Sequence, residues 1–456
     1  MKFNKWDLLI MIPFLFPLTL MENYKFFYIP FFIILLKNIY LCYKKSISIE
    51  ELLIVMAIYS ILISDNFIII GFVGLLGIYY FIQIILKKRK LDFKDKTFTR
   101  MIIILGIYLV FNIIVNRVPL PNVILFFMYN IVFMAIPVMF KFLDVDCYKT
   151  IDKTINTALI SQMIAVVLVV ILNFGVVLSN LFGDWSIGTL GVSQGVQLFN
   201  LFIFGSIKFF AYFNKTKEKK YLGGFIICVL FSLSTVTLAN TMLFFLALGI
   251  YVILFISSPK FKILFLGIIV ALVGTFWFTS HPWVREQMKD TLFNSEFRNE
   301  RIKKLKTYED TYIKLPQKDL KAAAIGVGAG YYSSRSALTV SGYYTTWYNK
   351  DRFPTYVNKY ARKYIRPRIY QRMGLSIVDQ PTSQYISIMG EFGYIGVILF
   401  AVALILLLFK SNRYNGLTLI YFAITLSLDN YMEYPKIALM FWITYFLIEQ
   451  TGCFNE

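Results

Sequence analysis

The side chains best suited to chemistry gather between residues 281 and 384 and at the start of the apolar run that follows. This segment contains 19 Lys and Arg against nine Asp and Glu, a surplus of ten, which is half of the chain's net charge of +20. Clustered cations attract anionic groups such as phosphates. The segment, called the basic segment below, therefore predicts a site for an anionic partner. The alternative is a solvated loop without such a role.

Arg298 and Arg301 are the first candidate ligands for a diphosphate. They lie three residues apart in a segment whose helical periodicity continues to Tyr312, so we expect them to share one face of a helix. Two guanidinium groups one turn apart can each bind a phosphate through two hydrogen bonds, which lysine cannot do. Arg335 and Arg352 are the next candidates. The alternative is an amphipathic helix whose basic residues contact lipid headgroups.

Aromatic residues accompany these cations. The basic segment contains eleven tyrosines, and a tyrosine ring offers a flat apolar face with a hydroxyl at its edge. Such faces stack well on sugar rings, so Tyr331, Tyr332, Tyr356 and Tyr360 are candidate sugar-binding residues. Packing or anchoring at the membrane interface explains tyrosines equally well.

Three side chains are candidate general bases: Asp379, Glu391 and His281. Glu391 lies about six residues into an apolar run, where an ionisable residue is a functional candidate or a buried partner of an arginine. His281 is the only histidine, and the four cysteines are scattered, so a His/Cys zinc site is excluded. The basic segment has no D-x-D pair. We therefore predict chemistry without a metal or other cofactor.

The glycine-rich sequence GVGAG at 326–330 is expected to reverse the chain between two helices, and its N–H groups could also bind an anion. No lysine of the Walker type follows the glycines, which excludes a nucleotide-binding P-loop.

The elements that position these residues are predicted to be transmembrane helices. The chain has 456 residues, of which 58% are hydrophobic and 16% charged, and its mean hydropathy is +0.65. Apolar runs of spanning length recur along it, and only helices satisfy their own backbone in lipid. We predict an all-α integral membrane protein with about fourteen spans. Their cores are 6–21, 26–43, 51–64, 67–86, 101–115, 123–142, 157–181, 196–213, 221–238, 242–257, 263–280, 385–409, 417–428 and 436–450.

Lys and Arg in the short loops predict the orientation. Basic loops at 87–96, 214–220, 258–262 and 410–416 alternate with loops that lack Lys and Arg, and basic loops face the cytoplasm. Both termini are then cytoplasmic. The chain divides into residues 1–280 with eleven spans, an extracytoplasmic helical domain at 281–384, and residues 385–456 with three spans. A basic surface outside the cytoplasm excludes nucleic acid as a partner.

These features together resemble a known superfamily. Many spans, a late and large external loop, an arginine about 25 residues before GVGAGYY (326–332), and YISIMGEFGYIG (385–396) at the start of the next span are similar to the O-antigen polymerases and ligases. The Wzy-type polysaccharide polymerases are the more similar branch. The resemblance implies a GT-C-like membrane glycosyltransferase in the bacterial cytoplasmic membrane. It also implies an undecaprenyl-diphosphate-linked oligosaccharide as donor, polymerised on the outer face, with a chain-length regulator and a flippase as further partners.

Two departures from the superfamily bear on the activity. Ligases usually have a histidine nine residues before the glutamate of E-x-G-x-x-G, and here that position is Thr382, which favours a polymerase over a ligase. The mid-chain external arginine is absent, and Arg117 is an unsupported substitute. The alternatives are ligase-type transfer of the glycan to another acceptor, or a flippase or other transporter. A transporter usually has internal repeats, and we find none.

Overall fold

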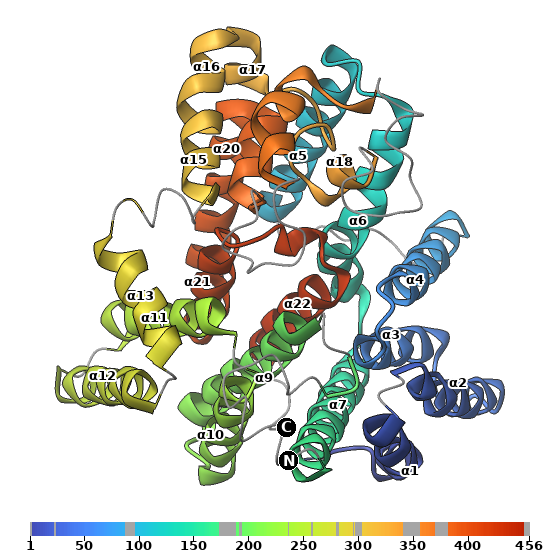
Figure 1. The fold of residues 1–456 in the computed structure, drawn as a ribbon. Helices are drawn as coiled ribbons and strands as arrows, with labels where there is room; N and C mark the ends of the chain where they lie inside the picture. The colour runs from blue at the N-terminus through green and yellow to red at the C-terminus, as the bar shows by residue number, and fades with distance from the viewer. Residues whose placement is uncertain are drawn as a thin grey trace.

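The protein is built from helices packed side by side (Figure 1). The structure, a computed structural model, describes residues 2–21, 24–86, 96–172, 188–190, 194–235, 237–256, 259–279, 282–294, 296, 303–340, 356–369 and 382–450. These residues form helices, turns and irregular segments but no strand. The prediction of an all-α membrane protein is confirmed at this level.

The described chain before the basic segment consists mostly of α-helices. They are α1 (Lys5–Met21), α2 (Tyr28–Tyr43), α3 (Ile49–Tyr59), α4 (Phe67–Ile85), α5 (Lys96–Val115), α6 (Leu120–Met139), α7 (Val145–Leu172), α9 (Gly195–Thr216), α10 (Lys219–Leu233), α11 (Leu238–Phe255) and α12 (Pro259–Thr279). Local sequence explains several boundaries. For example, Ser48 and Glu51 form a capping box at the start of α3, which satisfies two backbone N–H groups.

Among the described residues, six helices are long and apolar enough to cross a membrane. They are Lys25–Tyr43, Phe67–Ile85, Leu120–Phe142, Val145–Leu172, Gly195–Thr216 and Gln384–Lys410. Each predicted span core overlaps a helix, including the shorter α21 (Gly416–Thr425) and α22 (Pro435–Gln450). The apolar runs therefore predicted where helices form. The count of fourteen spans stays a prediction.

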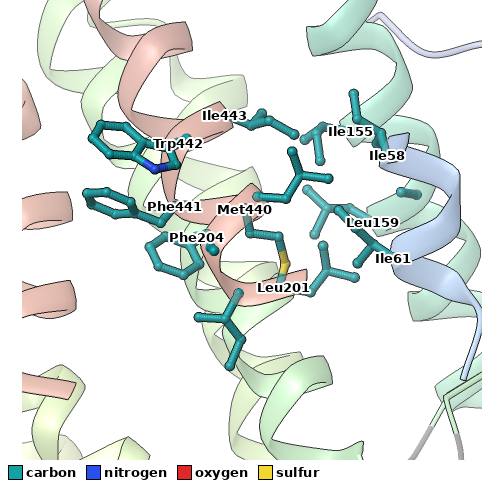
Figure 2. Packing of buried hydrophobic residues seen from close by; sticks show 14 of the residues in the cluster. Ile58, Ile61, Ile155, Leu159, Leu201, Phe204, Met440, Phe441, Trp442 and Ile443 are labelled. Atoms are coloured by element: carbon teal, nitrogen blue, oxygen red, sulfur yellow. The ribbon is translucent and has the colours of Figure 1, made fainter. Parts of the chain in front are cut away.

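The core lies where α3, α7, α9 and α22 meet. Figure 2 shows side chains from these four helices gathered at this junction, among them Ile58, Leu159, Phe204 and Met440. Of the six candidate spans, α9 is the most enclosed, since 89% of its most apolar stretch is buried inside the protein. Many residues of α4 and α5 are instead exposed and apolar, as lipid-facing helices require.

A small residue lets α7 and α9 approach each other closely. A methyl group at Gly205 of α9 would lie 2.8 Å from Leu159 of α7. Helices in membranes commonly pack through small residues, because apolar contact with lipid is as favourable as contact with protein.

From residue 303 onward, the described part of the basic segment packs on the ends of α5, α6 and α20 (Gln384–Lys410), at the end of the molecule opposite the N-terminus (Figure 1). The earlier helix of the segment, Pro282–Phe293, lies apart from this region, on the side of α11 and α12 (Figure 1). The elements of the basic segment are α13 (Pro282–Phe293), α15 (Lys303–Glu309), η5 (Asp310–Lys314), α16 (Leu315–Lys318), α17 (Leu320–Ile325), α18 (Arg335–Val340), η7 (Ala361–Ile365) and α19 (Arg366–Ile369). The domain boundaries at 281 and 384 stay a prediction.

Helical spacing in the basic segment is confirmed where the structure describes it. The rings of Tyr308 and Tyr312 stack with centroids 5.9 Å apart, and those of Tyr360 and Tyr364 stack at 6.4 Å. Lys304 of α15 is buried, and its side chain donates to the carbonyl oxygen of Leu428, because α15 packs against the segment that follows α21.

Candidate functional site

The glycine sequence 326–330 forms a tight loop on α20. Gly326, Gly328 and Gly330 all have positive φ, and a methyl group at Gly326 would lie 2.2 Å from the backbone of Glu391. The amides of Val327 and Gly328 donate to the carbonyl oxygens of Gly390 and Glu391. This loop therefore reverses the chain, as the sequence predicted, and it needs glycine both for backbone conformation and for close approach.

A break in α20 supplies the acceptors for that loop. Gly393 has φ of +64° inside the helix, so the helical hydrogen-bond ladder is interrupted there. Asn112 of α5 fixes the junction from the other side: its amide group donates to the carbonyl oxygens of Ile325 and Glu391, and its oxygen accepts from the amide of Ala329. The loop, α5 and α20 are thus held together by backbone polar groups that would otherwise be unpaired.

Glu391 points into the glycine loop and not into a solvent-filled cleft. Its carboxylate is 1% exposed and accepts hydrogen bonds from the backbone amides of Gly330 at 2.7 Å, Tyr332 at 3.2 Å and Ser334 at 3.1 Å. Three amide donors compensate the buried charge. The sequence left open a buried arginine as the partner of Glu391, but the partners are backbone amides. This geometry favours an anchoring role over that of a base.

Arg335, a predicted diphosphate ligand, lies in a buried ion pair. Its guanidinium donates to Asp429 at 3.1 Å and stacks on the ring of Tyr434 at 3.2 Å. The hydroxyl of Tyr434 donates to the same carboxylate of Asp429 at 2.9 Å. The guanidinium is 7% exposed. Its charge is therefore already compensated within the protein.

Further polar residues extend this cluster. Asn430 donates to the carbonyl oxygen of Ser333 and contacts Ser387 of α20, and Glu433 accepts from the backbone amide of Arg335 at 2.5 Å. We call the set the polar centre; it consists of Ser333, Arg335, Ser387, Glu391, Asp429, Asn430 and Glu433. It joins the basic segment to α20 and to the connection between α21 and α22.

Glu433 is the member of the polar centre best suited to proton transfer. It lies in the short helix η9 (Tyr431–Glu433) between α21 and α22. Burial and the nearby negative charge of Glu391 raise its pKa to about 8, although the backbone amides of Arg335 and Ser336 act in the opposite direction. A carboxyl group with such a pKa can accept or donate a proton near neutral pH.

Lys436 is a second buried cation that the sequence analysis did not single out. It is fully buried in the first turn of α22, and its ammonium donates to the side-chain oxygen of Gln194 at 2.6 Å. In the described part of the chain it forms no ion pair, although Asp65 exerts an electrostatic attraction on it. Gln194 precedes α9, so Lys436 lies where two helices begin. Helix N-termini are themselves positive, which makes this region favourable for an anion.

The predicted sugar-binding tyrosines divide into two groups. Tyr331, Tyr332 and Tyr356 line one small pocket together with Arg366, and its free volume of about 10 Å³ leaves room for one water molecule at most. Tyr332 is buried and contacts the hydroxyl of Thr311. Tyr360 donates to Asp319 instead. Three of the four tyrosines are thus brought together, in a pocket that must widen before it can admit a sugar.

The other predicted site residues, Asp379, His281, Arg298, Arg301 and Arg352, lie outside the described residues. Within the described part of the chain, no group of His, Cys, Asp or Glu has an arrangement that could hold a metal ion. The residues that sequence reasoning missed, Asp429, Glu433 and Lys436, do carry a signal. The sequence DNYMEYPK (429–436) puts three ionisable groups between two apolar runs, where charges are costly unless they have a role.

The fold and the polar centre define an α-helical, membrane-embedded protein with ionisable groups buried between its helices. Comparison with protein-family models, curated proteins and solved structures finds no match to this chain.

Proposed function

We propose that the protein is a membrane glycosyltransferase that polymerises undecaprenyl-diphosphate-linked oligosaccharide units into a surface polysaccharide. The observation that supports this best is the polar centre, which is buried between helices of spanning character and bound to a basic, tyrosine-rich segment. Charged groups are costly inside a membrane and are retained there for binding or chemistry. A purely structural subunit has little use for them.

The proposed reaction joins two lipid-linked glycans. A hydroxyl of one sugar attacks the anomeric carbon of the other, a new C–O bond forms, and the bond from that carbon to the diphosphate breaks. The lipid diphosphate leaves with the electron pair, and the hydroxyl proton passes to a base. Fixed cations stabilise the charge that develops on the diphosphate. The proposed cations are Arg298, Arg301 and Arg352. The proposed base is Asp379 or His281, and Glu433 is a further candidate for the base because its pKa is raised.

The finer architecture belongs to the same proposal. About fourteen spans and a GT-C-like arrangement in the bacterial cytoplasmic membrane, with both termini cytoplasmic, would place the basic segment on the outer face. The described parts of the basic segment from α15 onward and the N-terminus lie at opposite ends of the molecule (Figure 1), which supports this orientation. The Lys and Arg content of the short loops supports it independently, because basic loops favour the cytoplasmic side.

Reconstitution tests the proposal directly. The purified protein is placed in liposomes with a lipid-diphosphate-linked oligosaccharide as the only glycan, and products are separated by length. We expect a ladder of glycans that differ by one repeat unit. Control liposomes that contain the donor but no protein should keep the single starting band. If the wild-type protein also leaves only that band, the proposal is wrong for this donor.

Ligase-type transfer predicts a different product in the same assay. A ligase needs a second, chemically different acceptor and makes no ladder without one. A polymerase uses its donor as acceptor as well.

The buried Lys436, which forms no ion pair within the described residues, is the observation that favours a transporter as the second candidate, because ionisable groups inside a membrane often mark transport paths. A flippase would move the lipid-linked oligosaccharide between leaflets without lengthening it. Measuring glycan accessibility to an added hydrolase in the same liposomes separates the two activities.

A further inference from the structure

A second cationic site lies far from the polar centre, at the N-terminus. The segment before α1 packs against α7, where the amide of Asn4 donates to Thr157 at 2.8 Å and Asn156 donates to the carbonyl oxygen of Lys2 at 2.9 Å. These bonds hold the N-terminal segment in place. Between the two elements is a pocket of about 570 Å³, a size typical of ligand-binding sites.

The lining of this pocket is strongly cationic. It includes Lys2, Lys5, Lys153, Thr150 and Thr154, and no acidic residue lines it among those described. Within the same part of the chain, none of the three lysines forms an ion pair. The pocket also lies at the N-terminus of the 17-residue helix α1, whose dipole adds positive potential.

The acidic residues close to these lysines in sequence are engaged elsewhere. Asp7 pairs with Lys37 and accepts from the hydroxyl of Tyr59. Asp152 pairs with Lys208 at 2.8 Å. Two carboxylates contact uncharged lining residues: Glu51 accepts from the hydroxyl of Thr150 at 3.0 Å, and Asp7 accepts from the side-chain amide of Asn4. The charge of the three lysines is thus left for a ligand.

The flank of α1 indicates where the ligand comes from. Trp6 is 74% exposed and Leu9 is 58% exposed, and both belong to the helix that begins at the pocket. Exposed tryptophan beside lysine is typical of the level at which lipid headgroups meet the acyl chains. A ligand with a phosphate in the pocket and acyl chains along the exposed face of α1 fits both features.

We propose that this pocket, called the lysine pocket, binds the phosphate of an anionic phospholipid headgroup. The proposal does not depend on the proposed function. Each lysine near an anionic lipid contributes about 1 kcal/mol, or roughly fivefold in affinity. Removing all three should therefore weaken binding by about a hundredfold.

The test uses the full-length protein in a neutral detergent and native mass spectrometry. Phosphatidylglycerol and phosphatidylcholine are titrated separately, and bound lipid is counted per protein. We expect phosphatidylglycerol to bind at least about tenfold more tightly, which is the contribution of two or more lysines. Equal binding of the two lipids by the wild-type protein would overturn the proposal without any variant.

Variants locate the site. The triple variant K2Q/K5Q/K153Q should lose the preference for phosphatidylglycerol, and K2R/K5R/K153R should keep it. The matched control K45Q/K215Q/K260Q removes the same charge from the same predicted side of the membrane and should behave as wild type. If the control loses as much binding as the first triple variant, general charge and not this pocket is responsible, and the assignment fails.

A competition arm separates the lipid from soluble phosphate. Millimolar inorganic phosphate should leave the bound phosphatidylglycerol in place, because it lacks the acyl chains that contact α1. Displacement at comparable molar concentrations would instead identify a site for free phosphate, and the lipid assignment would then be wrong.

Discussion

Replacing the buried Lys436 is expected to change the stability and the activity of the protein in opposite directions. Burying an ammonium without a carboxylate partner destabilises the folded state by several kcal/mol. We therefore expect Lys436→Met, which keeps the length of the side chain, to raise the melting temperature of the protein in detergent. If Lys436 contacts the anionic part of the substrate, the same change should lower ladder synthesis about tenfold or more.

Lys436→Arg is the control for that prediction, since it keeps the charge and should keep part of the activity. A variant Lys436→Met that is less stable than wild type, with normal synthesis, would show that the lysine is only a structural donor to Gln194.

Glu433 gives stability a defined dependence on pH. Its pKa in the folded protein is raised to about 8 from a usual value of 4.5, so the folded state holds a proton that the unfolded state has released. The contribution of Glu433 to the free energy of unfolding is therefore complete below pH 4.5 and is lost as the pH rises toward 8. We expect the melting temperature of wild type to fall between pH 5 and pH 8 more than that of Glu433→Gln. Parallel curves would contradict this account of Glu433.

Arg298 and Arg301 are tested by substitutions that keep charge but change shape. If they bind the diphosphate, Arg301→Lys should cost roughly a hundredfold in rate, or about 3 kcal/mol, because lysine lacks the planar fork. If they contact only lipid headgroups, lysine should serve nearly as well. Lys306→Gln is the matched control, since Lys306 is exposed on α15, whereas Lys304 is buried and unsuitable. Polymer length and amount are measured at equal protein level.

At the scale of elements, the glycine loop and α20 form one unit. A side chain at Gly326 must adopt a φ of +74° and displace the backbone of Glu391. We expect Gly326→Ala to destabilise the protein by about 3 kcal/mol or more and to reduce its yield, because strain and the loss of loop hydrogen bonds add together. Gly74→Ala in α4, where the added methyl group meets no atom within 4 Å, should be neutral or stabilising by up to about 1 kcal/mol. Equal melting temperatures for the two variants would show that the loop tolerates displacement.

For the whole molecule, we expect polymer synthesis to survive chelation. The basic segment has no D-x-D pair, and the described residues form no group suited to a metal ion. Ladder synthesis should be unchanged by EDTA, since arginines stabilise the leaving diphosphate in the proposed mechanism. Loss of activity with EDTA and its recovery with Mg²⁺ or Mn²⁺ would favour a metal in that role.

The helices could be predicted from the sequence because each apolar run determines its own conformation in lipid. The polar centre could not. The sequence predicted Arg335 as a ligand of the substrate diphosphate. In the structure it pairs instead with Asp429, which lies 94 residues later in the chain. Glu391 was found as a buried acid, yet its donors are amides of a loop about 60 residues earlier. Side-chain periodicity describes one helix at a time and carries no information on which distant segments meet.

The binding of the glycine loop by α20 has a consequence for how the chain is made. Residues 330–335 leave the ribosome well before Glu391 and Glu433. The carboxylate of Glu391 accepts from the backbone amides of Gly330 and Ser334, and that of Glu433 accepts from the backbone amide of Arg335. Until α20 and η9 have been made, these amides lack the acceptors that they have in the folded protein. The basic segment therefore reaches its final structure only after residue 433 has been added, and a nascent chain stopped after residue 383 should be readily cleaved by protease in this loop. Insertion of α20 and the segment that follows it is thus the step that completes the site.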